Sequence, residues 1–164
     1  MGCGCAKGNC NVYFRARKEA AKYNERLTSR EGAAEMLGLS VSSLADYELG
    51  ITKVVPVDKV VLMAELYNSP ELRAEYCKNE CPIGKYMTMA TTIKGIEGIA
   101  LRLIKSLDSD GIKCIEKELL EIAEDGVISD EEKPTLQNMI EKLNYLSVII
   151  SELRLLGEKI LKEK

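Results

Sequence analysis

A stretch near the N-terminus, residues 29–50, constrains the fold more than any other part of the chain. It begins with Ser29, a residue type that often caps helices, and continues with small and apolar side chains at helical spacing. Gly38 interrupts this pattern, because a glycine can take the left-handed conformation that a sharp turn requires. Ser40 then caps a second helix, which runs to about Leu49. The stretch therefore predicts two short helices joined by a tight turn.

The apolar side chains of these two helices favour a close crossing between them. Ala33, Ala34 and Leu37 share one face of the first helix. Two helices joined by a three- or four-residue turn need a short side chain at their closest approach, and Ala34 provides one. Leu44 and Tyr47 lie three residues apart in the second helix, so we expect both to face inward.

These residues resemble the lambda-repressor/Cro-like regulators, the XRE-type helix-turn-helix family. The matching elements are Ala34, Gly38-Leu39-Ser40, Leu44, Tyr47-Glu48-Leu49-Gly50, Lys53 and Pro56. The resemblance covers roughly Val12 to Tyr76 and implies a five-helix domain whose third helix, Ser40 to Leu49, enters the major groove of double-stranded DNA. Because such domains commonly act in pairs, it also implies a sequence-specific DNA-binding transcriptional regulator that acts as a homodimer.

Carried over by position, six residues are expected to contact DNA. The residues facing base edges would be Val41, Ser42 and Asp46, with Ser43 beside them, and those contacting phosphates would be Arg30 and Lys53. The predicted recognition helix contains no Lys or Arg, so the common pairing of arginine with guanine is not available to it. Glu48 is expected to be structural, as the resemblance implies.

The distribution of charge separates the two halves of the chain. The net charge is -3. Residues 1–30 contain seven Lys and Arg against two Glu, a local excess of five positive charges, whereas residues 86–164 contain eleven Lys and Arg against fifteen Asp and Glu. The basic start predicts sequence-independent attraction to phosphate, and the alternative is an ordinary solvated helix face.

Composition and periodicity predict an all-α fold. Leu, Ile, Ala and Val recur at helical spacing, and strand-like alternation is absent. We expect a five-helix lambda-repressor-like domain followed by a three-helix bundle or coiled-coil-like domain. The expected boundaries are a Cys-rich arm at 1–11, the helix-turn-helix domain at 12–81, a linker at 82–90 and a helical C-terminal domain at 91–164.

The last predicted helix carries a long apolar stripe. It begins near a capping box at Ser129–Glu132. The stripe consists of Leu136, Met139, Leu143, Leu146, Ile150, Leu153 and Ile160 in heptad register. Two interpretations stay open, a homodimer formed through this helix and a closed bundle within one chain.

The cysteines suggest a site whose chemistry the sequence leaves open. Five of them form the candidate metal set, namely Cys3, Cys5, Cys10, Cys77 and Cys81. The chain has no histidine, so structural zinc or an iron–sulfur cluster would need thiolate ligands, but the spacing matches no familiar zinc motif. A redox-active disulfide and inert free thiols are the alternatives. We expect Cys114, beside Ile115, to be buried.

Other function classes find little support in the sequence. No signal peptide and no apolar span of ~18 residues is present, so a cytoplasmic protein without a membrane partner is expected. Without histidine or a glycine-rich phosphate loop, enzymatic activity is not expected. The alternatives to a DNA-binding regulator are a helix-turn-helix scaffold used as a protein-interaction adaptor and a metal- or thiol-responsive regulator.

Overall fold

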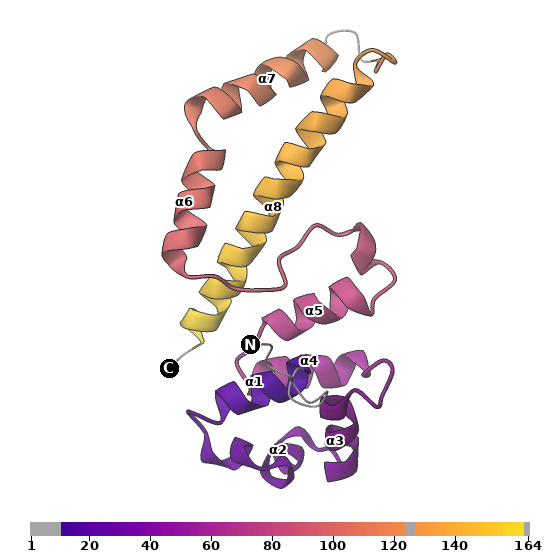
Figure 1. Ribbon diagram of the computed structural model, residues 1–164, viewed down its shortest axis with the longest axis vertical. Helices are drawn as coiled ribbons and strands as arrows, with labels where there is room; N and C mark the ends of the chain where they lie inside the picture. The colour runs from indigo at the N-terminus through magenta and orange to yellow at the C-terminus, as the bar shows by residue number, and fades with distance from the viewer. Residues whose placement is uncertain (1–10, 124–126, 163–164) are drawn as a thin grey trace, which may run out of the picture. The chain divides into compact units, whose positions relative to one another are not determined.

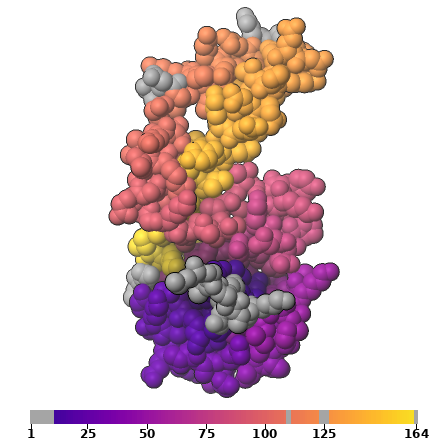
Figure 2. All heavy atoms as spheres, in the orientation of Figure 1, coloured from indigo at the N-terminus to yellow at the C-terminus, as the bar shows by residue number. Residues whose placement is uncertain are grey.

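The computed structural model describes residues 11–123 and 127–162, and it is all-α, as predicted (Figure 1). Within these ranges there are eight α-helices and two short 3-10 helices, and no strand. The chain divides into two compact units, whose residues can be followed by their colour in Figure 2. The N-terminal unit comprises residues 1–87 and 158–164, and the C-terminal unit comprises residues 88–157. The domain boundaries expected from the sequence stay predictions.

The N-terminal unit contains the five expected α-helices around a single core. In chain order its elements are α1 (Val12–Ala20), η2 (Glu25–Thr28), α2 (Arg30–Leu37), α3 (Val41–Leu49), α4 (Val57–Leu66), α5 (Glu71–Asn79) and η3 (Gly84–Tyr86). The core is one cluster of buried side chains contributed by every α-helix of this unit. Ala33, Ala34 and Leu44 are almost completely buried in it, which confirms the close crossing predicted for α2 and α3.

Helix α1 is shorter than the sequence predicts, which is a helix from about Val12 to Arg26 with Tyr23 among its inward-facing residues. It ends at Ala20 rather than continuing to Arg26, and a turn leads into η2. The side chain of Asn24 accepts a hydrogen bond from the backbone N–H of Arg26 and caps η2, which competes with continuation of the helix. Tyr23, predicted to face inward, is therefore 87% exposed, whereas Leu27 is buried from η2.

Helix caps fix the turns around α2 and α3. The hydroxyls of Ser29 and Ser40 each accept a hydrogen bond from a backbone N–H three residues later, at 3.0 Å. Gly38 has the left-handed conformation that the sequence predicts, with φ of 63°, and Gly50 ends α3 in the same way with φ of 70°. The turn between the two helices is thus specified by local chemistry.

The C-terminal unit is built from three further helices, as expected. They are α6 (Ile96–Ser106), α7 (Ser109–Ala123) and α8 (Lys133–Leu161), of which the last residues, from 158, belong to the N-terminal unit. Near the start of α8, the carboxylate of Glu132 accepts hydrogen bonds from the backbone N–H and hydroxyl of Ser129, at 2.8 and 2.6 Å. The predicted bundle or coiled-coil packing of these helices stays a prediction.

Burial along α8 differs from the predicted stripe. Of the seven heptad positions only Met139 is buried, and Leu143 and Ile150 are each 44% exposed. The other buried positions of α8 are Ile149 and Glu152. The heptad pattern therefore does not describe the face that α8 buries within one chain.

A buried glutamate organises the C-terminal unit. Glu152 is 2% exposed, and its carboxylate accepts hydrogen bonds from the backbone N–H of Lys94 and from the guanidinium of Arg102, both at 2.6 Å. Beside it, the hydroxyl of Ser151 accepts a hydrogen bond from the backbone N–H of Ala90 at 2.6 Å. These contacts attach the segment before α6 to α8, which is a connection that apolar periodicity does not reveal.

The prediction that Cys114 is buried is wrong. The residue is exposed on α7, and its thiol donates a hydrogen bond to the carboxylate of Glu118 at 3.2 Å. A cysteine is small enough to lie at the edge of an apolar stripe, so the neighbouring Ile115 did not determine its burial. Among the described helices, none is both long and apolar enough to cross a membrane.

Candidate nucleic-acid interface

The candidate interface is the outer side of the α2–turn–α3 segment (Figure 1). The turn is closed by a hydrogen bond from the backbone N–H of Leu39 to the carbonyl of Ala34 at 2.9 Å, the pattern in which a left-handed glycine satisfies the end of a helix. Leu44 is fully buried beneath the turn. The outer face of α3 is consequently held at a fixed angle to α2.

A buried ionic cluster connects α3 to α1 and α2. The Glu48 side chain is 0% exposed, and its two carboxylate oxygens accept hydrogen bonds from the Nε and Nη2 atoms of Arg17, the second at 2.9 Å. The Nε atom of Arg30 donates to the same carboxylate at 2.8 Å. Arg17 also donates to the carbonyls of Leu27 and Thr28, at 2.9 and 3.1 Å. Three helices therefore meet at one carboxylate, and η2 is attached to them through the Arg17 guanidinium.

Electrostatics keep this carboxylate ionised. Burial raises the pKa of Glu48, but the hydrogen bonds from Arg17 and Arg30 outweigh that effect, so the pKa lies below its ordinary value. The same hydrogen bond to Glu48 raises the pKa of Arg17 against the opposing effect of burial. The structural role expected for Glu48 is thus explained by a buried negative charge that Arg17 and Arg30 compensate.

This cluster reduces the positive charge that the start of the chain offers to a ligand. Arg17 is 2% exposed and paired with Glu48, so it offers no charge to a ligand at the surface. Arg26 pairs with Glu35 at 2.9 Å. Glu35 and Glu48 lie beyond residue 30 in the sequence, but in the fold they pair with Arg26 and Arg17. Arg15, in contrast, is exposed, and its guanidinium has no ion-pair or hydrogen-bond partner among the described residues.

The predicted phosphate contacts lie on two different elements. Arg30 begins α2, and its side chain is 34% exposed while its Nε atom binds Glu48. Lys53 is exposed in the segment between α3 and α4, with no ion-pair partner in the described part of the chain. The structure thus orients Arg30 through a carboxylate and leaves Lys53 available. Their contact with phosphate stays a prediction.

The predicted base-contacting residues lie on α3 with unequal exposure. Val41 is 40% exposed and Ser42 is exposed, whereas Ser43 and Asp46 are partly buried. The hydroxyl of Ser40 lies 3.0 Å from that of Ser42 and 2.8 Å from that of Ser43, so these side chains also take part in capping the helix. Their roles at base edges stay predictions.

One residue that the sequence interpretation missed is Asn11. Its side-chain oxygen accepts a hydrogen bond from the backbone N–H of Tyr13 at 2.9 Å and caps α1. Its side-chain nitrogen donates to the carbonyl of Tyr47 at 3.0 Å and thereby attaches the start of α1 to the end of α3. An asparagine directly before an amphipathic helix is a recognisable cap, but the contact across 36 residues has no local signal.

The candidate metal ligands are only partly within the described residues. Cys3, Cys5 and Cys10 lie outside them. Cys77 and Cys81 are free thiols of intermediate exposure near the end of α5. Among residues 11–123 and 127–162, no group of three or more His, Cys, Asp or Glu is arranged to hold a metal ion. Zinc or iron–sulfur binding by the five cysteines stays a prediction.

Comparison with known proteins agrees with this geometry. Residues 18–72 match the model of a family described as helix-turn-helix. Searches of curated proteins and of solved structures give no match. The matched segment contains the capped α2–turn–α3 arrangement and the Glu48 cluster, except for Arg17, which lies one residue before it. Residues 18–72 are therefore a helix-turn-helix domain of the lambda-repressor/Cro-like, XRE type, the DNA-binding domain of a transcriptional regulator.

Proposed function

We propose that the chain is a sequence-specific transcriptional regulator that binds double-stranded DNA as a homodimer, with α3 in the major groove. The observation that carries the proposal is the buried Glu48 cluster, which joins α1, α2 and α3 and leaves the outer face of α3 exposed. A rigidly oriented helix is what groove recognition requires, because base contacts depend on fixed geometry.

Affinity in this proposal comes mostly from outside α3. The helix has no Lys or Arg, so Val41, Ser42 and Asp46 supply only apolar, hydroxyl and carboxylate contacts to base edges. Lys53 and Arg15 are the exposed cations without internal partners that we expect near the phosphates. A second copy of the domain would double these contacts and read a second half-site.

Selection of bound duplexes from a random pool, followed by fluorescence anisotropy at several salt concentrations, tests this function. Lys53→Ala and Arg15→Ala should each weaken binding to all sequences and reduce the salt slope by about one. Lys78→Ala, which removes an exposed cation from α5, is the matched control and should change little. If the full chain shows no salt-dependent retention of DNA, the proposal fails.

Exposed apolar residues along α3 and in the segment after it favour the adaptor as a second candidate function. Val41, Leu49, Ile51, Val54 and Val57 are between 40% and 67% exposed. Protein interfaces often use such clusters, whereas a DNA surface is usually polar and basic. Substitution of Ile51 and Val57 by Ser distinguishes the two functions. An adaptor would lose its partner protein, whereas the salt-dependent DNA binding of a regulator would change little.

A further inference from the structure

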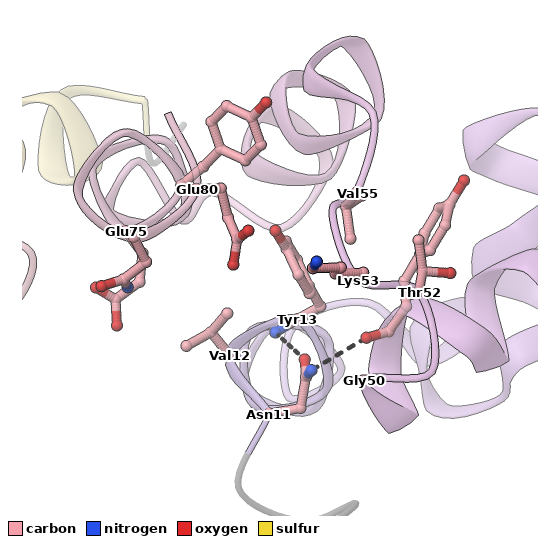
Figure 3. A pocket seen from close by; sticks show the side chains of 12 residues that line it. Asn11, Val12, Tyr13, Gly50, Thr52, Lys53, Val55, Glu75 and Glu80 are labelled. Carbon is pink, nitrogen blue, oxygen red and sulfur yellow. Dashed lines mark hydrogen bonds between the residues drawn. The ribbon is translucent and has the colours of Figure 1, made fainter. Parts of the chain in front are cut away.

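A pocket of about 410 Å³ lies beside the end of α3 in the N-terminal unit (Figure 3). Its walls come from the start of α1, the segment after α3 and the second half of α5. This volume is within the range of small-molecule sites in proteins. The pocket is separate from the outer face of α3 that is proposed to contact bases, although Lys53 belongs to its wall.

The side chain of Tyr13 enters this pocket with an unused polar group. Tyr13 is 8% exposed, and its hydroxyl has no hydrogen-bond partner among the described residues. Figure 3 shows its ring rising from α1 into the space between Glu80 and Lys53. Burial and the nearby groups Glu80, Tyr76 and Glu75 raise the pKa of Tyr13 to about 12, so the hydroxyl is neutral at physiological pH. Such a group is available to a ligand.

The charges around the pocket favour a cation. Glu75 and Glu80 contribute two carboxylates against the single ammonium of Lys53. Neither carboxylate has an ion-pair partner within the described residues. Tyr13 and Tyr76 add aromatic surface, which attracts organic cations through the ring faces. The described residues provide no cluster of three or more metal-ligating side chains, which argues against a divalent metal.

We propose that this pocket binds a small organic cation, with its ammonium group near Glu75 and Glu80 and its aliphatic part against Tyr13 and Tyr76. A ligand whose ammonium group has N–H bonds then donates a hydrogen bond to the Tyr13 hydroxyl oxygen. The apolar side chains of Val12 and Val55 cover the remaining wall.

The position of the pocket gives the ligand a route to α3. Asn11, at the edge of the pocket, joins the backbone of Tyr13 to the carbonyl of Tyr47. Lys53 lies on the pocket wall and is also an expected phosphate contact. A bound cation would repel the Lys53 ammonium and change the affinity for DNA. This regulatory consequence rests on the proposed function, whereas cation binding itself does not.

Isothermal titration of the full chain with choline and with 1,4-diaminobutane tests the pocket. Saturable binding is expected for at least one of these probes. Glu75→Gln and Glu80→Gln together should weaken it roughly tenfold, because the charges of the half-buried Glu75 and the exposed Glu80 beside the ammonium are both lost. Glu65→Gln, which neutralises an exposed glutamate of α4 outside the pocket, is the matched control and should leave the affinity unchanged.

Three results would overturn the pocket assignment. They are the absence of saturable binding by both probes, equal weakening in Glu65→Gln and in the double variant, and binding of calcium chloride with the same dependence on Glu75 and Glu80. Anisotropy with a selected duplex then measures the DNA affinity with and without the saturating probe. Cation binding without any effect on DNA would leave the pocket in place and remove only the regulatory consequence.

Discussion

The two compact units bury their apolar residues in different ways. The N-terminal unit gathers thirteen buried side chains into one core cluster. In the described part of the C-terminal unit, the buried apolar side chains are Ala90, Ile99, Ile122, Met139 and Ile149. Its helices expose many others, among them Leu101, Ile104, Leu107, Leu119, Leu120 and Leu143. The first unit therefore has one continuous core, whereas the second leaves many apolar side chains of its helices exposed, as expected if a second copy covers them.

Both units also bury a glutamate, and the difference between these two sites is instructive. Glu48 faces Arg17, which is 2% exposed, and Glu152 faces Arg102, which is 24% exposed. Removal of the carboxylate destabilises the fold less where the arginine keeps contact with water. The N-terminal unit should therefore depend more strongly on its buried charge.

The largest effect is expected from Glu48→Gln, which leaves the buried Arg17 charge without compensation. We expect the free energy of unfolding to fall by about 3 kcal/mol, near the lower end of values for broken buried ion pairs. Glu152→Gln should cost less, about 1–2 kcal/mol, because water reaches Arg102. Urea unfolding followed by circular dichroism measures both. Equal losses in the two variants would contradict the comparison.

Acid should remove the same contribution from the wild-type protein. The pKa of Glu48 lies below its ordinary value of 4.5 in the folded state, so its stabilising effect is fully present above pH 4.5 and is lost as pH falls through the folded pKa. The difference in unfolding free energy between wild type and Glu48→Gln should therefore be largest near pH 7 and shrink below pH 4.5. A constant difference between pH 7 and pH 3 would rule this explanation out.

The exposed heptad positions of α8 provide the next test. Leu143→Lys combined with Ile150→Lys should weaken a homodimer at least tenfold, about 1.4 kcal/mol, because each adds a charge to a position that is 44% exposed in one chain. Ile83→Lys changes an equally apolar exposed residue in the N-terminal unit and serves as the control. Sedimentation of the full chain measures association. If the wild type is a monomer at every concentration, the dimer proposal fails.

Two glycines, one in each unit, give the smallest expected effects with opposite signs. Neither Gly38 nor Gly98 has a neighbour within 4 Å of an added Cβ, so only backbone conformation distinguishes them. Gly38→Ala should destabilise by about 1 kcal/mol because alanine resists a φ of 63°. Gly98→Ala, inside α6, should stabilise by about 0.5 kcal/mol. Thermal unfolding of both variants checks the two signs, and the same sign in both would contradict this reasoning.

Local signals predicted the helix-turn-helix segment well. Ser29, Gly38 and Ser40 determine their own conformations through hydrogen bonds and sterics within a few residues. The same approach failed at Tyr23, because a helix pattern continued in the sequence after the chain had turned. It also failed at Cys114, where spacing did not distinguish the edge of an apolar stripe from its centre.

The candidate site was less predictable than the fold around it. The resemblance predicts six positions for contact with DNA, but the pairing of Arg17 and Arg30 with Glu48 joins residues 31 and 18 positions apart. Charge counting over a segment cannot detect such pairs, since electrostatic compensation depends on distance in space. The pocket at Tyr13 was missed for the same reason, because α1, α3 and α5 each supply part of it.

The sequence by itself determined the all-α class, the capped turn between α2 and α3 and the identity of the helix-turn-helix domain. These features depend on periodicity and on interactions between near neighbours. Only the tertiary structure decided which cations are neutralised, which apolar side chains of α8 are buried and where a ligand pocket can form. Each of these depends on helices that pack together after long intervals of sequence, and burial then sets the energy of every charge they bring into contact.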